Sequence, residues 1–284
     1  MSSSLPAVAG VTHEYVDAGG LRTHVALAGD PAAPPVLLLH GWPQHWWTWR
    51  EVVPLLADAY RLVMPDLRGQ GWTDAPDGDY GKEQLTTDVL ATLDALGLGQ
   101  VTWVGHDWGG WVGFLAGLRA PGRLSGLVAV SVTHPWQARA DARVLDAWRM
   151  GYQAVVATPY VGERLVRTPS AVAQVLQAGG RDVSPYTDRL CDVRRARASV
   201  QLYRTFLTRE VPALLAGRYA DERLRVPTLL LVGERDPVIT PRLVAGYESH
   251  TDDMTVEVIR GAGHFLPESH PAEVARAVRR LAGS

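Results

Sequence analysis

Short apolar runs rich in β-branched residues alternate along the chain with longer segments in which apolar positions recur every three or four residues. The short runs predict buried strands and the longer segments predict amphipathic helices, an alternation typical of a largely parallel sheet covered by helices. The first strands are compatible with an antiparallel hairpin. The predicted strands are 21–29, 36–40, 61–66, 101–105, 126–132, 228–234 and 255–261, and the predicted helices are 48–58, 82–97, the segment after Trp108, 240–248 and 271–283.

Between Thr133 and Arg225 the strand signal disappears and the sequence becomes helical, with several interrupting prolines. So long a connection without structure of its own is unusual between two strands of one sheet. We therefore expect a core domain formed by residues 1–132 and 226–284, and an inserted helical cap formed by residues 133–225. Since ligands bind at the carboxyl ends of the strands in open α/β sheets, the cap is expected to cover that end.

The composition restricts the partners of the protein. The formal net charge is -2, so we expect no electrostatic binding to nucleic acid or to a membrane surface. Cys191 is the only cysteine, which excludes an intrachain disulfide and a cysteine-rich zinc site. The N-terminus has no basic segment followed by an apolar stretch, and no run reaches transmembrane length. A cytoplasmic protein with a small ligand of low charge is therefore expected.

The segment VGHDWGG, residues 104–110, joins a predicted strand to a predicted helix. Glycines two positions before and after Asp107 favour a tight turn in which backbone approaches backbone, although Asp107 could instead cap the helix. A carboxylate is already ionised at neutral pH and can displace a leaving group at saturated carbon, whereas a serine must first lose its proton and suits acyl carbon. Asp107 therefore suggests an enzyme with an ester intermediate.

Two later segments offer partners for this nucleophile. Asp236, in GERDPV, follows a predicted strand, and His264, in GAGHF, lies in a glycine-rich turn after the next one. Glu234 is the alternative acid, but it lies closer to the strand. The order nucleophile, acid, histidine is one in which catalytic triads occur, with His264 as general base and Asp236 as the acid that orients it.

The sequence resembles the epoxide hydrolases of the α/β-hydrolase fold, with which it shares HGWP, DLRGQG, GHDWGG, GERD and GAGHF across nearly the full length. The resemblance implies a strained nucleophile elbow at Asp107 and an oxyanion hole formed by the backbone N–H groups of Trp42 and Trp108. It also implies that an epoxide is opened by Asp107, that the resulting hydroxyalkyl ester is hydrolysed, and that a vicinal diol leaves. No metal or organic cofactor is needed, and a homodimer is compatible with the resemblance.

Members of this family use two cap tyrosines as hydrogen-bond donors to the epoxide oxygen, and the resemblance assigns this role to Tyr152 and Tyr203. The segment YQAVVATPYVGERLV carries the first and SVQLYRTF the second. Met150 and Gly151 replace the Ser-Trp that usually precedes the first tyrosine. The tyrosines held in reserve are Tyr160, Tyr186 and Tyr219.

Ten Trp residues against three Phe residues suggest an aromatic-lined cavity, for which we expect Trp46, Trp136 and Trp148 to bind substrate. Haloalkane dehalogenases share the aspartate elbow and form the alternative reading, in which Trp108 and a second tryptophan bind the halide. A ligand-binding protein without turnover is a more remote alternative, because none of the three triad residues is missing.

Overall fold

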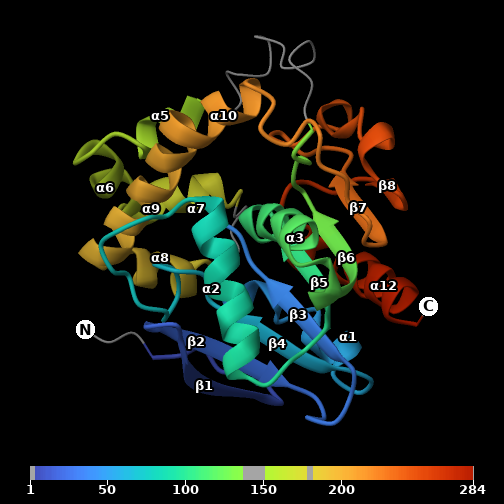
Figure 1. Ribbon diagram of the computed structural model, residues 1–284. Helices are drawn as coiled ribbons and strands as arrows, with labels where there is room; N and C mark the ends of the chain where they lie inside the picture. The colour runs from blue at the N-terminus through green and yellow to red at the C-terminus, as the bar shows by residue number, and fades with distance from the viewer. Residues whose placement is uncertain (1–3, 137–150, 178–181, 284) are drawn as a thin grey trace.

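A computed structural model describes residues 4–136, 151–177 and 182–283 (Figure 1). The described residues form an eight-stranded sheet in the order β1-β2-β4-β3-β5-β6-β7-β8, in which β1 pairs with β2 and β2 with β4 antiparallel while the other neighbours are parallel. The predicted mostly parallel sheet is confirmed, and the N-terminal hairpin includes a strand that the apolar pattern missed, β1. The strands are β1 (Val11–Ala18), β2 (Leu21–Ala28), β3 (Pro35–Leu39), β4 (Arg61–Pro65), β5 (Val101–His106), β6 (Leu124–Val130), β7 (Thr228–Gly233) and β8 (Met254–Ile259).

Helices cover both faces of this sheet, and β3 illustrates why its strands are apolar throughout. Successive side chains of a strand point to opposite faces. Leu37 and Leu39 pack in one cluster with residues of two helices, and Val36 and Leu38 pack in a second cluster on the other face. All four are fully buried, since helices lie on both sides. The helices are α2 (Lys82–Ala95) and α3 (Trp108–Arg119) on the first face, and α1 (Val53–Leu56) and α12 (Pro271–Ala282) on the second.

The described residues between β6 and β7 form helices and no strand, so the predicted helical insertion is confirmed as part of the fold. Figure 1 shows these helices gathered at one end of the sheet. Trp42 follows β3, and its indole N–H donates to Ser199 in α9 at 2.9 Å, so the insertion lies over the carboxyl ends of the strands. The helices are α5 (Gly151–Val156), α6 (Val161–Val166), α7 (Pro169–Val175), α8 (Ser184–Leu190), α9 (Val193–Thr205), a π-helical segment (Phe206–Glu210) and α10 (Val211–Leu215).

Two predicted helices are shorter in the structure than the pattern indicated. In the segment 48–58 the α-helix is confined to α1, because Pro54 near its start has no N–H with which to continue an earlier turn. In the segment 240–248 only a 3₁₀ turn forms before Gly246, whose φ of 86° is incompatible with a continuing helix. Among the described residues, no helix has the length and apolar character needed to cross a membrane.

Candidate active site

The turn between β5 and α3 holds Asp107 in a strained backbone conformation, with φ 50° and ψ -120°. A non-glycine residue keeps such a conformation only where the surroundings enforce it, and this is most common at functional sites. A Cβ atom at Gly105 would collide with the backbone of Gly109, and one at Gly109 would collide with the carbonyl of Leu39. The side chain of Asp107 does not cap α3, so the capping alternative does not account for it.

Two backbone amides from separate segments meet at the Asp107 carboxylate. The N–H of Trp42 donates to Oδ2 of Asp107 at 3.0 Å, and the adjacent N–H of Trp108 also lowers the pKa of this carboxylate. The two amides converge because β3 and β5 are neighbours, with both chains turning at their carboxyl ends. Preorganised donors of this kind are worth roughly 3–4 kcal/mol each when they hold an oxyanion in a transition state.

Burial raises the pKa of Asp107 from 3.8 to about 6, because the charged form loses its hydration. The shift is limited by His264, by the amides of Trp108 and Trp42, and by Lys82, all of which favour the ionised carboxylate. At neutral pH Asp107 is therefore mainly ionised and poorly hydrated. Such a carboxylate is available to act as a nucleophile.

His264 lies after β8 and is paired with Asp236, the residue expected to orient it. Nδ1 of His264 and Oδ2 of Asp236 are 2.8 Å apart, and the other carboxylate oxygen accepts the N–H groups of Val238 and Ile239 at 2.8 and 2.9 Å. Glu234, the alternative acid, instead accepts from the N–H of Gly261 at 2.8 Å. The geometry thus brings Asp236 rather than Glu234 to the imidazole.

The pKa of His264 is raised above 6.5 by opposing influences. Burial lowers it, but the charge of Asp236, the hydrogen bond to Asp236 and the charge of Asp107 together outweigh burial. Behind the ring, Nε2 of His106 donates to the carbonyl oxygen of His264 at 3.0 Å. His106 therefore supports the turn that carries the imidazole.

The hydroxyl groups of Tyr152, from α5, and Tyr203, from α9, lie 3.5 Å apart. Their rings pack on Trp42, with centroid distances of 6.3 Å for Tyr152 and 5.0 Å for Tyr203. Burial, reinforced by Asp107, raises the pKa of Tyr152 to about 12, and burial also raises that of Tyr203. Both phenols are protonated at neutral pH and can donate hydrogen bonds.

A cavity of about 490 Å³ lies between the helical insertion and the sheet. Of the predicted site residues it touches Trp42, Tyr152 and His264. Its mainly apolar and aromatic wall suits a small uncharged ligand. The lining residues that the sequence analysis missed are Gln174, Val175, Gln177, Pro237, Val238 and Phe265. Three of these, Pro237, Val238 and Phe265, lie within two positions of the predicted triad residues and could have been found from that position, whereas α7 and the residues after it gave no signal.

Two of the tryptophans expected to bind substrate are not on this cavity, and the prediction is corrected. Trp46 is fully buried in the cluster on the face of the sheet covered by α1 and α12, because it belongs to a 3₁₀ turn that packs inward. The indole N–H of Trp136 donates to the carbonyl of Glu222 at 2.9 Å, and its ring stacks on His250. Trp148 lies outside the described residues.

The reserve tyrosines lie elsewhere. The hydroxyls of Tyr186 and Tyr219 hydrogen-bond Glu268 and Glu83, and Tyr160 is 83% exposed.

Within the described part of the chain, no group of three or more His, Cys, Asp or Glu side chains is arranged to hold a metal ion.

Comparison with known proteins identifies the family of this chain. A family model described as alpha/beta hydrolase fold matches residues 34–271, and the chain belongs to this family. It is 30% identical to Epoxide hydrolase A of Mycobacterium tuberculosis, over 94% of this chain and 96% of that protein. It is 27% identical to Epoxide hydrolase 3 of Xenopus tropicalis, over 92% of this chain and 74% of that protein. The crystal structure of epoxide hydrolase VrEH1 from Vigna radiata superimposes with a TM-score of 0.81 and 25% identity, covering 98% of this chain and 99% of that one. The resemblance read from the motifs is confirmed.

Proposed function

We propose that the protein is an epoxide hydrolase that converts a small epoxide into a vicinal diol through an ester of Asp107. The observation that carries the proposal is a buried carboxylate, a His–Asp pair and two protonated phenols that converge where the helical insertion meets the sheet. In this proposal residues 1–132 and 226–284 form the core domain that supplies the triad, and residues 133–225 form the cap that supplies the phenols. The names of the related proteins support the same activity.

In the first step, a carboxylate oxygen of Asp107 attacks one carbon of the epoxide ring. The bond from that carbon to the ring oxygen breaks, and the oxygen takes the electron pair. Tyr152 and Tyr203 donate hydrogen bonds to the developing alkoxide, and one of them provides its proton. The product is a hydroxyalkyl ester of Asp107.

In the second step, water attacks the carbonyl carbon of this ester while His264 accepts a proton from it. The N–H groups of Trp42 and Trp108 hold the oxyanion, and Asp236 stabilises the imidazolium. Ester formation removes the charge of Asp107, which is one of the influences that raise the pKa of His264. A larger fraction of the imidazole is therefore neutral and able to accept a proton once the ester is present. When the tetrahedral intermediate collapses, its hydroxyl proton passes to the departing diol oxygen and the carboxylate of Asp107 is restored. The imidazolium then returns its proton through solvent to the phenolate formed in the first step.

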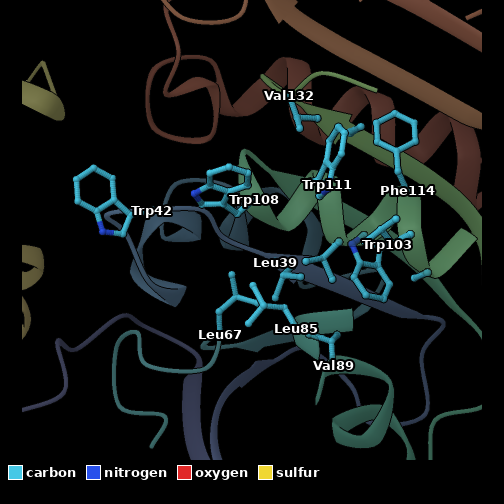
Figure 2. Packing of buried hydrophobic residues seen from close by; sticks show 14 of the residues in the cluster. Leu39, Trp42, Leu67, Leu85, Val89, Trp103, Trp108, Trp111, Phe114 and Val132 are labelled. Atoms are coloured by element: carbon cyan, nitrogen blue, oxygen red, sulfur yellow. The ribbon is translucent and has the colours of Figure 1, made fainter. Parts of the chain in front are cut away.

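One observation favours haloalkane dehalogenation as a second candidate. The buried indole N–H of Trp108 has no hydrogen bond of good geometry among the described residues, and Figure 2 shows its nitrogen on the side of the ring away from Trp103 and Trp111. A halide needs a second donor, however, and the indole N–H groups of Trp42 and Trp136 are already engaged. The paired phenols favour the epoxide, and halide release from 1-haloalkanes, assayed beside styrene oxide hydrolysis, separates the two activities.

A single turnover in heavy-oxygen water tests the covalent mechanism, using an epoxide first selected from an aliphatic and aryl panel by diol detection. Because water attacks the ester carbonyl, we expect the label in the Asp107 carboxylate and not in the first diol. His264→Gln should accumulate the ester, seen as the added mass of the substrate on the intact protein. Label in the first diol, together with no adduct in His264→Gln, would mean that water opens the epoxide directly.

Location and assembly stay predictions from the sequence. A cytoplasmic enzyme without a nucleic-acid or membrane partner is in keeping with the net charge of -2. A homodimer is the assembly that we would test first, by light scattering of the purified protein.

A further inference from the structure

Lys82 is buried where the first turn of α2 meets the helical insertion. Only 1% of its side chain is exposed, and Nζ lies 2.9 Å from Oε2 of Glu210. The backbone N–H of Lys82 donates to the other oxygen of the same carboxylate at 2.6 Å. A single glutamate thus binds both the side chain and the helix start, so this contact fixes the insertion relative to α2.

The ammonium group also contacts two aromatic rings. Nζ of Lys82 lies 4.0 Å from the ring centroid of Trp108 and 5.0 Å from that of Phe206. Trp108 packs edge-on against both Phe206 and Tyr203, at 4.8 and 5.7 Å. A desolvated cation is attracted to the face of an indole ring, so these contacts restrain the Trp108 ring. The residue that supplies an amide to Asp107 is therefore held by the cation.

The backbone of the insertion is shaped around this contact. Phe206 and Glu210 are the first and last residues of the π-helical segment, which directly follows the helix that carries Tyr203. π-helical turns are rare and occur frequently at functional sites. Here the turn presents a ring and a carboxylate to the same ammonium group, close behind a proposed catalytic tyrosine.

Fold stability alone does not require a charge at this position. Buried ion pairs are often no more stable than well-packed apolar residues of similar volume. Burial lowers the pKa of Lys82, but Glu210, Asp107 and Asp79 all favour its charged form. Asp107 in turn is influenced by His264 as well as by Lys82. These are the charged groups that face the two side chains. The ion pair with Glu210 at 2.9 Å holds the charge of Lys82 in place although burial lowers its pKa.

We propose that Lys82 is a positioning residue for epoxide opening: held by Glu210, its ammonium fixes the Trp108 indole and the turn after Tyr203, and so the elbow that carries Asp107. The inference rests on the proposed function. Lys82 does not contact the reacting atoms in this role. It acts through Trp108 and through its electric field, which is stronger in a poorly hydrated site than in water.

The test compares the rate of ester formation in single turnovers across pH 5 to 9, in the wild type and three variants. Lys82→Met removes the charge at similar length, and Lys82→Met/Glu210→Gln also neutralises the partner, so that no unpaired charge stays buried. Arg209→Gln is the matched control, because Arg209 lies on the same turn and makes an exposed ion pair with Asp79 at 3.1 Å. Thermal unfolding of each variant reports stability separately.

We expect ester formation in both Lys82 variants to slow by about tenfold near pH 6 and by about threefold or less at pH 9, because loss of a nearby cation raises the pKa of the carboxylate. The double variant should recover thermal stability relative to Lys82→Met without recovering the rate at pH 6. Arg209→Gln should retain the wild-type profile. If Lys82→Met does not fold, the double variant alone decides the result.

A folded double variant with the wild-type pH profile would overturn the inference, and so would an equal loss at every pH, which would indicate a structural role only. Both results leave the proposed function intact, since the wild type would still form the ester. If the wild type itself forms neither ester nor diol from any epoxide of the panel, the proposed function fails, and this inference fails with it.

Discussion

Lowering the pH should slow ester formation and ester hydrolysis to different extents, because each step depends on a different group. In the proposed mechanism, attack on the epoxide needs the ionised form of Asp107, whereas hydrolysis of the ester needs the neutral form of His264. Burial raises the pKa of Asp107 to about 6, and the pKa of His264 is raised above 6.5. Lowering the pH therefore protonates both groups. The rate of each step falls around the pKa of the group on which that step depends.

The size of the effect on ester formation follows from the pKa of Asp107. With a midpoint of about 6, about nine tenths of the carboxylate is ionised at pH 7 and about one tenth at pH 5. The single-turnover rate should then fall by about tenfold between these two pH values. An ordinary aspartate, with its pKa of 3.8, would still be almost fully ionised at pH 5 and would show almost no change.

Rapid-quench single turnovers, with the ester detected as added mass on intact protein, measure the first step by itself. Steady-state diol formation over the same pH range measures the slower step. Circular dichroism at each pH checks that the fold is intact. A rate of ester formation that stays constant from pH 7 to pH 5 would refute the reasoning that burial controls the nucleophile.

Three further substitutions test the geometry. Tyr152→Phe and Tyr203→Phe, each made separately, should slow ester formation by on the order of 10²-fold with little change in hydrolysis of the ester. The reason is that, in the proposed mechanism, the phenols donate only to the epoxide oxygen. A variant that forms the ester as fast as the wild type in single turnover would assign the donor role to another group. Gly41→Ala should slow ester formation by on the order of 10²-fold or more, because the added methyl group would overlap the Asp107 carboxylate and displace it. Small displacements of reacting groups have effects of this size on the rate. Gly122→Ala, at a glycine with open space around it, is the control that should retain activity.

The positions of the proposed triad could be predicted because their signals are local. Asp107, Asp236 and His264 each follow a predicted strand, and carboxyl ends of parallel strands meet at one edge of a sheet. The elbow could also be predicted from its glycines, because the close backbone contacts leave no room for a side chain at these positions. A chemical type, a spacing and a place at a strand end are all properties of a short segment.

The cavity wall could not be predicted in the same way. Trp46 and Trp42 lie four positions apart in the segment after β3. Trp46 nevertheless packs on the face of the sheet covered by α1 and α12, whereas Trp42 lines the cavity. The contact between Lys82 and Glu210 joins residues 128 positions apart, and neither residue lies in a recognisable motif. Composition suggested aromatic residues around the ligand, but the direction of each ring depends on turns that pack against distant segments.

The sequence by itself determined seven of the eight strands that the structure describes, the helical insertion and the types of the proposed reacting groups, because apolar periodicity and turn residues act over a few neighbouring positions. Tertiary structure alone decided which side chains meet and how strongly they are charged. The pKa of Asp107 illustrates the division, since its value of about 6 depends on burial under the insertion and on four surrounding groups drawn from four separate segments. Long-range packing sets this environment, and no local pattern specifies it.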